Sequence, residues 1–379
     1  MNNKTLLRTP LFDLHMSLGA RMVAFANYDM PVLYPSGVMK EHLHTRAQAG
    51  LFDVSHMGQI LLRPKSGDIV DAAMALETLV PMDILGLPEG RQRYAFFTNE
   101  EGGILDDLMV ANRGDHLYLV VNAACKISDF AHLEAHLSEA CEIEMQEDRA
   151  LLAVQGPQSA VALGRLAPDV AKMRFMDVRE FSIDGAVCTV SRSGYTAEDG
   201  FEISVPADNA VDLAQALLGH ESVEPIGLGA RDSLRLEGGL CLYGSDIDTT
   251  TTPVEADLVW AIQKVRRTGG KRSGGFPGAD VILQQIVSGA DRKRVGLRPR
   301  GRAPMRSGTK LYANAETPES IGVVTSGGFG PTIGAPVAMG YLSTNFSKPG
   351  TEIFGEVRGK KLPMVVSDLP FVKPNFKRK

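Results

Sequence analysis

The sequence has few cysteines and no stretch that would cross a membrane. Its four cysteines are Cys125, Cys141, Cys188 and Cys241, and no two of them form a C-x-x-C pair. This scatter argues against a disulfide framework and against zinc held by thiolates, and it is typical of a reducing compartment. No apolar run approaches the roughly 18–20 residues that span a bilayer, so the sequence predicts no membrane partner.

Two nucleotide-binding motifs are also missing. Gly328-Phe-Gly330 begins like a dinucleotide fingerprint, but Ile333 stands where the third glycine is needed. Gly270-Lys271 is followed by Arg272 and lacks the earlier glycine of a P-loop. Both folds depend on glycines that let the backbone approach phosphate groups, so both are disfavoured. The histidines show no third ligand at a spacing typical of zinc, and no metal site is predicted.

Charge is unevenly distributed along the chain. The protein has 40 Lys+Arg and 45 Asp+Glu, for a formal charge of −5. Residues 261–310 contain 13 basic residues but only two acids, Asp280 and Asp291, which gives this window a charge of +11. Such asymmetry favours a local anionic partner. Nucleic acid is not predicted, because Phe276 is the only aromatic residue that could stack on bases there.

A chain of 379 residues is expected to form two or three domains. Helical and strand patterns are mixed in the first part, which predicts an α+β class. There, Ile127, Phe130, Leu133 and Leu137 recur at helical spacing and predict an amphipathic helix over 126–141. After Arg292, short strand-like runs separated by Gly and Pro predict an all-β module of roughly 85–90 residues.

The first candidate for chemistry is the run Gly102-Gly-Ile-Leu-Asp-Asp-Leu108, which places Asp106 and Asp107 in an apolar strand. Side chains alternate between faces in a strand, so one carboxylate must lie on a largely apolar face. Such a group is suited to binding an amine or transferring a proton. The spacing does not choose between the two residues, and a carboxylate at an exposed strand end is the simpler alternative.

Two further segments carry polar side chains of interest. Glu202 follows the turn Glu198-Asp-Gly200, and the two oxygens of its carboxylate could accept hydrogen bonds from two adjacent N–H groups of a ligand. The ordinary alternative is a glutamate that faces solvent. Arg231 and Arg235 lie one turn apart after a glycine-rich turn, where an Asp232–Arg235 ion pair is the simpler interpretation. The single Trp260 is expected to be partly buried.

Several segments taken together resemble one known family, the T-proteins of the glycine cleavage system. The resemblance runs from about residue 8 to the end, in matching order and spacing. The stretches that carry it are Thr9–His15, Met22–Ala26, Leu51–Met57, Asn99–Leu108, Gly194–Glu202, Ala230–Glu237, Leu240–Gly244 and Val337–Tyr341.

The resemblance implies a three-domain cloverleaf with two ferredoxin-like α+β domains and a C-terminal β-barrel of jelly-roll type. It implies that residues 1–55 with 150–240 form the first domain and 56–149 with 241–290 the second. Residues 291–379 would then form the barrel.

The activity implied is that of a tetrahydrofolate-dependent aminomethyltransferase. Such an enzyme takes the methylene group from the aminomethyl-lipoyl arm of H-protein, releases ammonia, and yields 5,10-methylenetetrahydrofolate and dihydrolipoyl H-protein. The partners implied are therefore lipoylated H-protein and tetrahydrofolate, with no metal. The short segment before Thr9 shows no leader peptide, which favours a bacterial cytoplasmic enzyme over a mature mitochondrial chain.

The resemblance also implies roles for particular residues. Asp107 matches the catalytic carboxylate, which settles the choice that the strand pattern left open. The residues that match cofactor-binding positions are Met57, Tyr94, Asn122, Tyr195, Glu202 and Arg231. Two departures stand out: Ala197 replaces a usual glycine, and Phe376 occupies a variable folate-contacting position.

Other interpretations of the sequence are weaker. Gly238–Gly244 lacks the Lys and Gln of the related folate protein involved in iron–sulfur cluster upkeep. A sarcosine or dimethylglycine dehydrogenase would need an FAD-binding half with its glycine fingerprint. A folate-dependent demethylase is a third alternative, and a nucleic-acid-binding module a fourth. Within the T-protein interpretation, the window Lys264–Arg306 becomes a candidate docking surface for the folate glutamate tail or H-protein.

Overall fold

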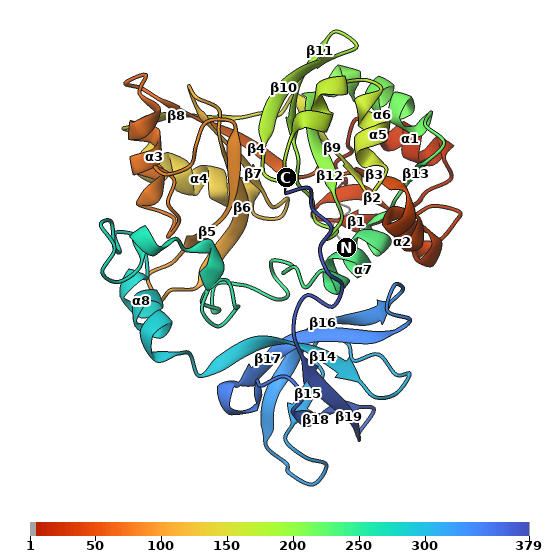
Figure 1. Ribbon diagram of the computed structural model, residues 1–379, viewed down its shortest axis with the longest axis vertical. Coiled ribbons are helices and arrows are strands. Elements are labelled where there is room, and N and C mark those ends of the chain that lie inside the picture. Colours follow the sequence, from red (N-terminus) through yellow and green to blue (C-terminus); the bar gives the residue numbers. More distant parts are fainter. Residues whose placement is uncertain (1–4, 379) are drawn as a thin grey trace.

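The computed structural model describes residues 5–378 as three lobes arranged around a common centre (Figure 1). Two lobes are α+β units, each built on one mostly antiparallel sheet, and the third is a closed barrel. The α+β class with a C-terminal barrel is therefore confirmed. Across the described residues, every helix is too short or too polar to cross a bilayer.

The first lobe is a six-stranded sheet of order β10-β11-β12-β9-β3-β13, preceded by the hairpin of β1 and β2. Its strands come from two separate parts of the chain. They are β1 Arg21–Phe25, β2 Tyr28–Leu33, β3 Ala49–Asp53, β9 Arg149–Gln155, β10 Val178–Ile183, β11 Ala186–Ser191, β12 Gly200–Pro206 and β13 Val223–Pro225. Its helices are α1 Phe12–Ser17, α2 Val38–Ala47, α5 Ser159–Gly164, α6 Ala210–Leu218 and α7 Leu228–Glu237, with 3₁₀ turns at Pro168–Lys172 and Ala207–Asn209.

The second lobe is a five-stranded sheet of order β5-β6-β7-β4-β8. Its elements are β4 Gly58–Pro64, α3 Ile69–Glu77, β5 Arg91–Thr98, β6 Ile104–Asn112, β7 Leu117–Val121, α4 Lys126–Leu137, β8 Cys141–Met145 and α8 Ala279–Ser288, with 3₁₀ turns at Val259–Ala261 and Lys264–Arg266. One continuous core joins this sheet to α3, α4 and α8 and to the connecting segment around Ile247 and Leu258. The lobe is thus completed by chain that follows the first lobe in sequence.

The third lobe is a barrel closed in the order β14-β17-β16-β15-β18-β19. Its elements are β14 Arg292–Pro299, β15 Lys310–Tyr312, β16 Ser320–Gly330, β17 Ala335–Ser343, a 3₁₀ turn at Thr344–Phe346, β18 Glu352–Val357 and β19 Lys360–Ser367. Closure leaves no free sheet edge, which explains how short strands rich in Gly and Pro form a stable unit. Its own small core contains Leu297, Leu311 and Met364.

Helix α4 lies against the second sheet through residues four apart. Cys125, Asp129, Leu133 and Leu137 are buried along this line. The expectation that Ile127 also faces the core is wrong, since its side chain is 72% exposed. Ile127 lies two positions after Cys125, and two positions turn an α-helix of 3.6 residues per turn by about 200°. Ile127 therefore lies on nearly the opposite side of the helix from the buried line.

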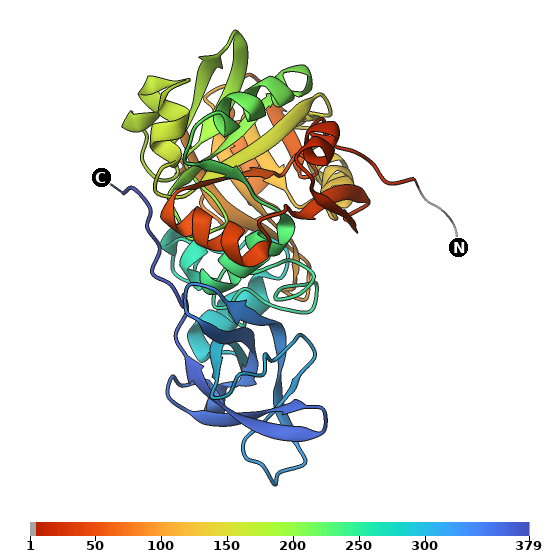
Figure 2. The same ribbon diagram turned by 90° about the vertical axis from the view of Figure 1, so that its right-hand side faces the viewer.

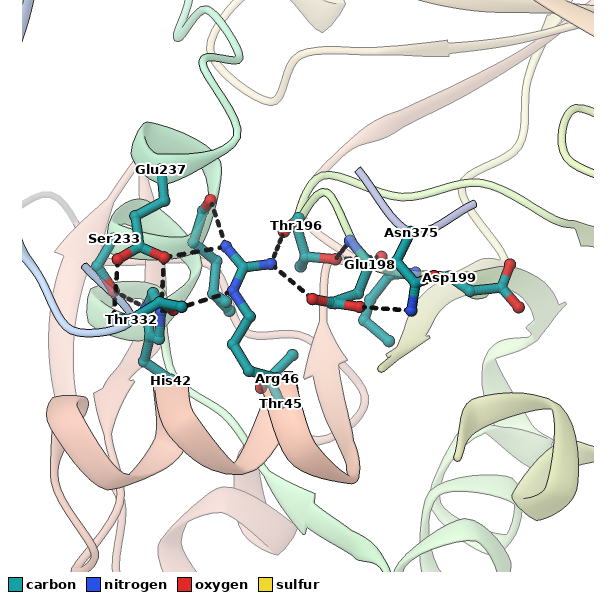
Figure 3. A network of polar contacts seen from close by, with 12 residues as sticks. His42, Thr45, Arg46, Thr196, Glu198, Asp199, Ser233, Glu237, Thr332 and Asn375 are labelled. Atoms are coloured by element: carbon teal, nitrogen blue, oxygen red, sulfur yellow. Dashed lines mark hydrogen bonds and ion pairs between the residues drawn. The ribbon is translucent and has the colours of Figure 1, made fainter. Parts of the chain in front are cut away.

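Glu237, at the end of α7, ties the first lobe to the barrel (Figure 3). One carboxylate oxygen, Oε2, is 3.0 Å from Nε2 of His42 and accepts a hydrogen bond from Arg46 at 3.2 Å. The other, Oε1, accepts the backbone N–H of Thr332 in the β16–β17 turn at 2.9 Å. Arg46 also pairs with Glu198 at 3.1 Å. Because this carboxylate is fully buried, its partners must replace all of its lost hydration.

A second buried ion pair joins α7 to the barrel through the chain that follows it. Arg235 Nη1 donates to Oδ2 of Asp246 at 2.8 Å, and Arg235 Nη2 donates to Ser326 Oγ of β16 at 2.9 Å. The Ser326 hydroxyl in turn donates to Asp246. The predicted Asp232–Arg235 pair is also present, at 2.7 Å, although Arg235 itself is buried rather than solvated.

The C-terminal segment runs from the barrel back to the first lobe (Figure 2). The N–H of Phe371 donates to the Glu237 carbonyl, and the N–H of Asn375 donates to the Ala197 carbonyl, both at 2.9 Å. The ring of Phe376 stacks on Phe175 with centroids 4.1 Å apart. The C-terminal segment therefore connects the barrel to the first lobe through hydrogen bonds and a stacking contact.

We predict that Glu237→Gln lowers the free energy of unfolding by about 3 kcal/mol at pH 7. Despite burial, which opposes ionisation, hydrogen bonds and charge from His42, Thr332 and Arg46 lower the pKa of Glu237 to about 2. A carboxylate with a lowered pKa stabilises the fold above its unfolded pKa and loses that effect as the pH falls.

Urea unfolding from pH 7 to pH 3 measures this effect. The difference between wild type and Glu237→Gln should shrink below about pH 4.5. Glu352→Gln is the matched control, because this exposed carboxylate pairs only with an exposed arginine and should change stability little. A difference that stays constant with pH would contradict the role assigned to Glu237.

Candidate active site

Strand β6 places its two adjacent carboxylates on opposite faces of the second sheet. Asp106 is fully buried and lies with Ile104, Leu108 and Val110 against the helices. Asp107 is half-buried, pairs across the ladder with Phe96 of β5, and points away from those helices. Asp106 is thus the carboxylate on the apolar face, and Asp107 is the one available to a ligand.

Asp107 is held by two hydrogen-bond donors. The Tyr94 hydroxyl donates to Oδ2 at 2.9 Å, and the Asn122 amide Nδ2 donates to Oδ1 at 2.7 Å. Burial, reinforced by the nearby Asp106 charge, raises the pKa of Asp107 to about 7 despite these bonds. A carboxyl group with this pKa exchanges protons readily at neutral pH, which is the property of a general acid or base.

The glycines before β6 allow the connecting chain to approach the site. A Cβ on Gly103 would lie 1.9 Å from the carbonyl oxygen of Thr249, so only glycine fits. The next residue, Ile104, donates its N–H to the Asp248 carbonyl at 3.0 Å. The Gly-Gly pair of the motif therefore fixes the start of the strand that carries Asp107.

A second group of predicted site residues comes from the first lobe. The guanidinium of Arg231, on α7, lies over the Tyr195 ring, 4.8 Å from its centroid. The Tyr195 hydroxyl donates to the Cys241 carbonyl, and Glu202 on β12 accepts a hydrogen bond from Ser193 Oγ at 2.8 Å. Burial raises the pKa of Tyr195, and the negative charge of Asp107 adds to this effect.

Arg231 leaves part of its binding capacity unused. Its Nη1 is buried and has no hydrogen-bond partner among the described residues. Burial lowers the pKa of Arg231, while the nearby Glu202 charge opposes that effect. Buried guanidinium nitrogens are normally satisfied, so this atom indicates a position where a ligand's acceptor group would bind.

Met57 and Trp260 complete the set of aromatic and apolar neighbours. Met57 is half-buried and packs on the cluster that includes Ala230 and Leu234 of α7. Trp260 stacks on Tyr94 with centroids 5.6 Å apart and planes 21° apart. The expectation that Trp260 is partly buried is wrong, because it lies on a 3₁₀ turn and is 65% exposed.

Sequence analysis missed Asp129, which lies behind the site. This residue on α4 is only 3% exposed, and its carboxyl group lies within interaction range of the Asp106 carboxyl group. The signal was present in the sequence, since Asp129 occupies the buried line of α4 between Cys125 and Leu133. A carboxylate at a core position of an amphipathic helix requires a partner.

The two departures from the family pattern have clear structural settings. Ala197 is buried and has a φ of +62°, in the left-handed region that glycine tolerates best. A Cβ on Gly238 would come within 3.0 Å of the Ala197 side chain, so Gly238 accommodates this alanine. Phe376 contacts Phe175 as described above.

About half of the 13 basic side chains in the 261–310 window are engaged within the protein. The five that form ion pairs are Arg266, Arg272, Arg292, Lys293 and Arg300. Arg294 is buried and donates to backbone carbonyls. A surface hollow of about 580 Å³ is lined by Lys264, Arg267 and Lys271. The window is therefore a much smaller free cationic surface than its charge suggested.

The fold defines a protein of the three-domain cloverleaf class, in which the half-buried Asp107 carboxyl group has a pKa raised to about 7 by burial and the nearby Asp106 charge. Comparison with known families narrows this class. The family described as the GCVT N-terminal domain matches residues 11–266, and the glycine cleavage T-protein C-terminal barrel domain matches residues 292–373. The chain belongs to the glycine cleavage T-protein family.

Similar proteins occur in eukaryotes and bacteria. Mitochondrial aminomethyltransferases from Dictyostelium discoideum and Gallus gallus are each 45% identical and cover 100% and 98% of this chain, over 95% and 94% of their own lengths. The crystal structure of glycine cleavage system aminomethyltransferase T from Bartonella henselae is 44% identical. It covers 98% of this chain and 100% of its own, with a TM-score of 0.91.

We predict that Ala197→Gly raises the free energy of unfolding by about 1 kcal/mol. Removing the Cβ relieves the cost of a left-handed conformation, which exceeds the added entropy of the unfolded chain. The control is Ala150→Gly in β9, where the same change in a regular strand should be destabilising by about 0.5–1 kcal/mol. Urea unfolding of both variants provides the test, and a loss of stability in Ala197→Gly would contradict the interpretation.

Proposed function

We propose that this protein is a tetrahydrofolate-dependent aminomethyltransferase of the glycine cleavage system. In the reaction, the methylene carbon of an S-aminomethyl group leaves its sulfur and its amino nitrogen. The carbon bonds to two folate nitrogens, and the protons they release go to the thiol and to ammonia. The observation that carries the proposal is Asp107, a half-buried carboxyl with a pKa of about 7, in a member of this family.

Asp107 would exchange protons at the reacting nitrogens. Its ionised form would also stabilise positive charge that develops on the methylene carbon as ammonia leaves. Tyr94 and Asn122 orient the carboxylate by donating to its two oxygens. Desolvation makes both effects stronger than they would be in water.

The residues around Arg231 fit a folate co-substrate. When bound, tetrahydrofolate would supply the two secondary amines that take the methylene group. Glu202 offers a carboxylate to the adjacent N–H groups of a pterin edge, a charge-assisted pairing. The unpartnered Nη1 of Arg231 would bind an acceptor on the same ligand, and Tyr195 and Met57 would form the walls beside it.

The donor of the aminomethyl group would be lipoylated H-protein. Lys264, Arg267 and Lys271 form the part of the basic window that we propose for contact with an anionic partner, either H-protein or the folate glutamate tail. The mitochondrial relatives fit the mitochondrial alternative, and the Bartonella henselae structure, at nearly the same identity, fits the bacterial source expected from the sequence.

We also propose the domain division implied by the family resemblance. Residues 1–55 with 150–240 would be the first domain, 56–149 with 241–290 the second, and 291–379 the barrel. The three main sheets and their separate cores support this division.

Asp107→Asn should lower kcat for folate-dependent ammonia release by at least about 100-fold, because the amide neither exchanges the proton nor carries the charge. In the wild type, kcat/KM should fall as the pH drops through about 7, where Asp107 becomes protonated. The assay uses aminomethylated lipoyl H-protein.

Asp115→Asn serves as the control, because this carboxylate lies on the exposed turn after β6 and should leave the rate unchanged. Full turnover by Asp107→Asn would overturn the assignment of this residue. Absence of turnover by wild type would overturn the proposed function.

Glu202→Gln should weaken tetrahydrofolate binding about tenfold or more, since a charge-assisted hydrogen bond contributes about 1.5–3 kcal/mol. Calorimetric titration measures the dissociation constant directly, without turnover. The control is Glu180→Gln on β10, two strands away in the same sheet, whose exposed carboxylate pairs with Arg113. Unchanged affinity in Glu202→Gln would remove this residue from the folate site.

A further inference from the structure

Three carboxyl groups and one amide form a continuous chain through the second sheet. Nδ2 of Asn122 donates to Asp107 Oδ1 at 2.7 Å and to Asp106 Oδ1 at 2.9 Å. The backbone N–H of Asn122 donates to the other oxygen of Asp106 at 3.0 Å. On the helix side, the buried carboxyl group of Asp129 on α4 lies within interaction range of the buried Asp106 carboxyl group. The chain therefore runs from the reacting side of the sheet into its core.

No cation compensates these three acids. Within residues 5–378, Asp106, Asp107 and Asp129 take part in none of the ion pairs. Five other titratable groups interact with these acids. Tyr94, Tyr195 and Cys241 lie near Asp107, and Cys125 and Tyr243 lie near the Asp106–Asp129 pair. The pKa of each of these five groups is raised, mainly by burial, so all five are neutral at physiological pH.

Two buried carboxyl groups in contact cannot both be ionised at moderate cost, so they share one proton. The hydrogen bonds indicate which of them is charged. Asp106 accepts one hydrogen bond from the backbone N–H of Asn122 and one from its side-chain amide, and these two donors stabilise the ionised form of Asp106. Asp129 has no comparable donor, and its Oδ2 has no hydrogen-bond partner in the described chain. Burial and the Asp106 charge raise the pKa of Asp129 far above its usual range.

We propose that Asp129 is a neutral carboxylic acid that donates to an ionised Asp106, and that the Asp106 charge makes Asp107 hold its proton up to neutral pH. Asp106 and Asp129 are positioning residues, because neither touches the reacting atoms. Hydrocarbon side chains at these two core positions would lose less hydration free energy on folding than two acids do. The proposed role of the Asp106–Asp129 pair explains why the core nevertheless contains both acids. Its catalytic consequence rests on the proposed function, but its protonation state does not.

Two substitutions separate the members of the pair. Asp129→Asn keeps a neutral donor to Asp106, so the acidic limb of the kcat/KM profile should stay within about 0.3 pH unit of wild type. Asp106→Asn removes the nearby charge, so the same limb should move at least about one pH unit lower. Glu134→Gln, on the exposed side of α4, is the control and should leave the profile unchanged. An unmoved limb in Asp106→Asn, or equal shifts in both variants, would overturn the proposal.

A second measurement does not depend on activity or on the folding of Asp106→Asn. Infrared spectra of the full-length protein at pH 8 should contain the carbonyl-stretch band of a buried protonated carboxylic acid. The band should be absent from Asp129→Asn and retained in Glu134→Gln. A wild type without the band, or a band that persists in Asp129→Asn, would overturn the proposal. Absence of turnover by wild type would reject the proposed function while leaving this spectroscopic result valid.

Discussion

The position of the barrel against the first lobe depends on the two buried charges at the end of helix α7. Arg235 binds Asp246 and Ser326, and Glu237 binds His42, Arg46 and the barrel turn at Thr332. A buried ion is tolerated only where hydrogen bonds replace its hydration, so each charge specifies the position of its partners closely. Because Arg231 lies one turn earlier on the same helix, fixing its end also fixes the guanidinium near Tyr195. The barrel therefore contributes to the site through α7.

The same physical effect acts in the opposite sense at Asp107. Glu237 is surrounded by cations and donors, which lower its pKa to about 2 and keep it charged. Asp107 has two neutral donors and an acidic neighbour, and its pKa rises to about 7. Burial alone does not determine which behaviour occurs; the neighbouring charges decide it. The same chain thus contains Glu237, whose surroundings keep its carboxylate ionised, and Asp107, whose surroundings favour proton exchange near neutral pH.

The sequence was sufficient for those features that depend on local patterns. Strand alternation placed Asp106 and Asp107 on opposite faces, and the Gly- and Pro-separated strands after Arg292 indicated an all-β C-terminal module, a sandwich or a barrel. It was insufficient where the outcome depends on long-range partners. Trp260 is exposed and stacks on Tyr94, 166 positions earlier in the chain, a contact that no local pattern indicates. The basic window misled for the same reason, because the acids that neutralise Arg266 and Arg272 are Glu77 and Asp83 in the second lobe. Charge counted along a segment cannot reveal partners supplied by another part of the chain.

The three buried acids lower the stability of the folded state in exchange for a carboxyl group that can exchange a proton. Asp106, Asp107 and Asp129 occupy sheet and helix positions that apolar residues would fill with less loss of hydration. A carboxyl group whose pKa is raised in the folded state costs stability increasingly from its unfolded pKa, about 4, up to its folded pKa, because only the unfolded chain is ionised over that range. Asp107 therefore costs stability over the same pH range in which its proton becomes exchangeable. The lowered pKa of Glu237 on α7 has the opposite effect on stability, which it increases as the pH rises from about 2 to about 4.5. The contacts of α7 therefore stabilise the fold at the pH at which Asp107 remains unfavourably buried.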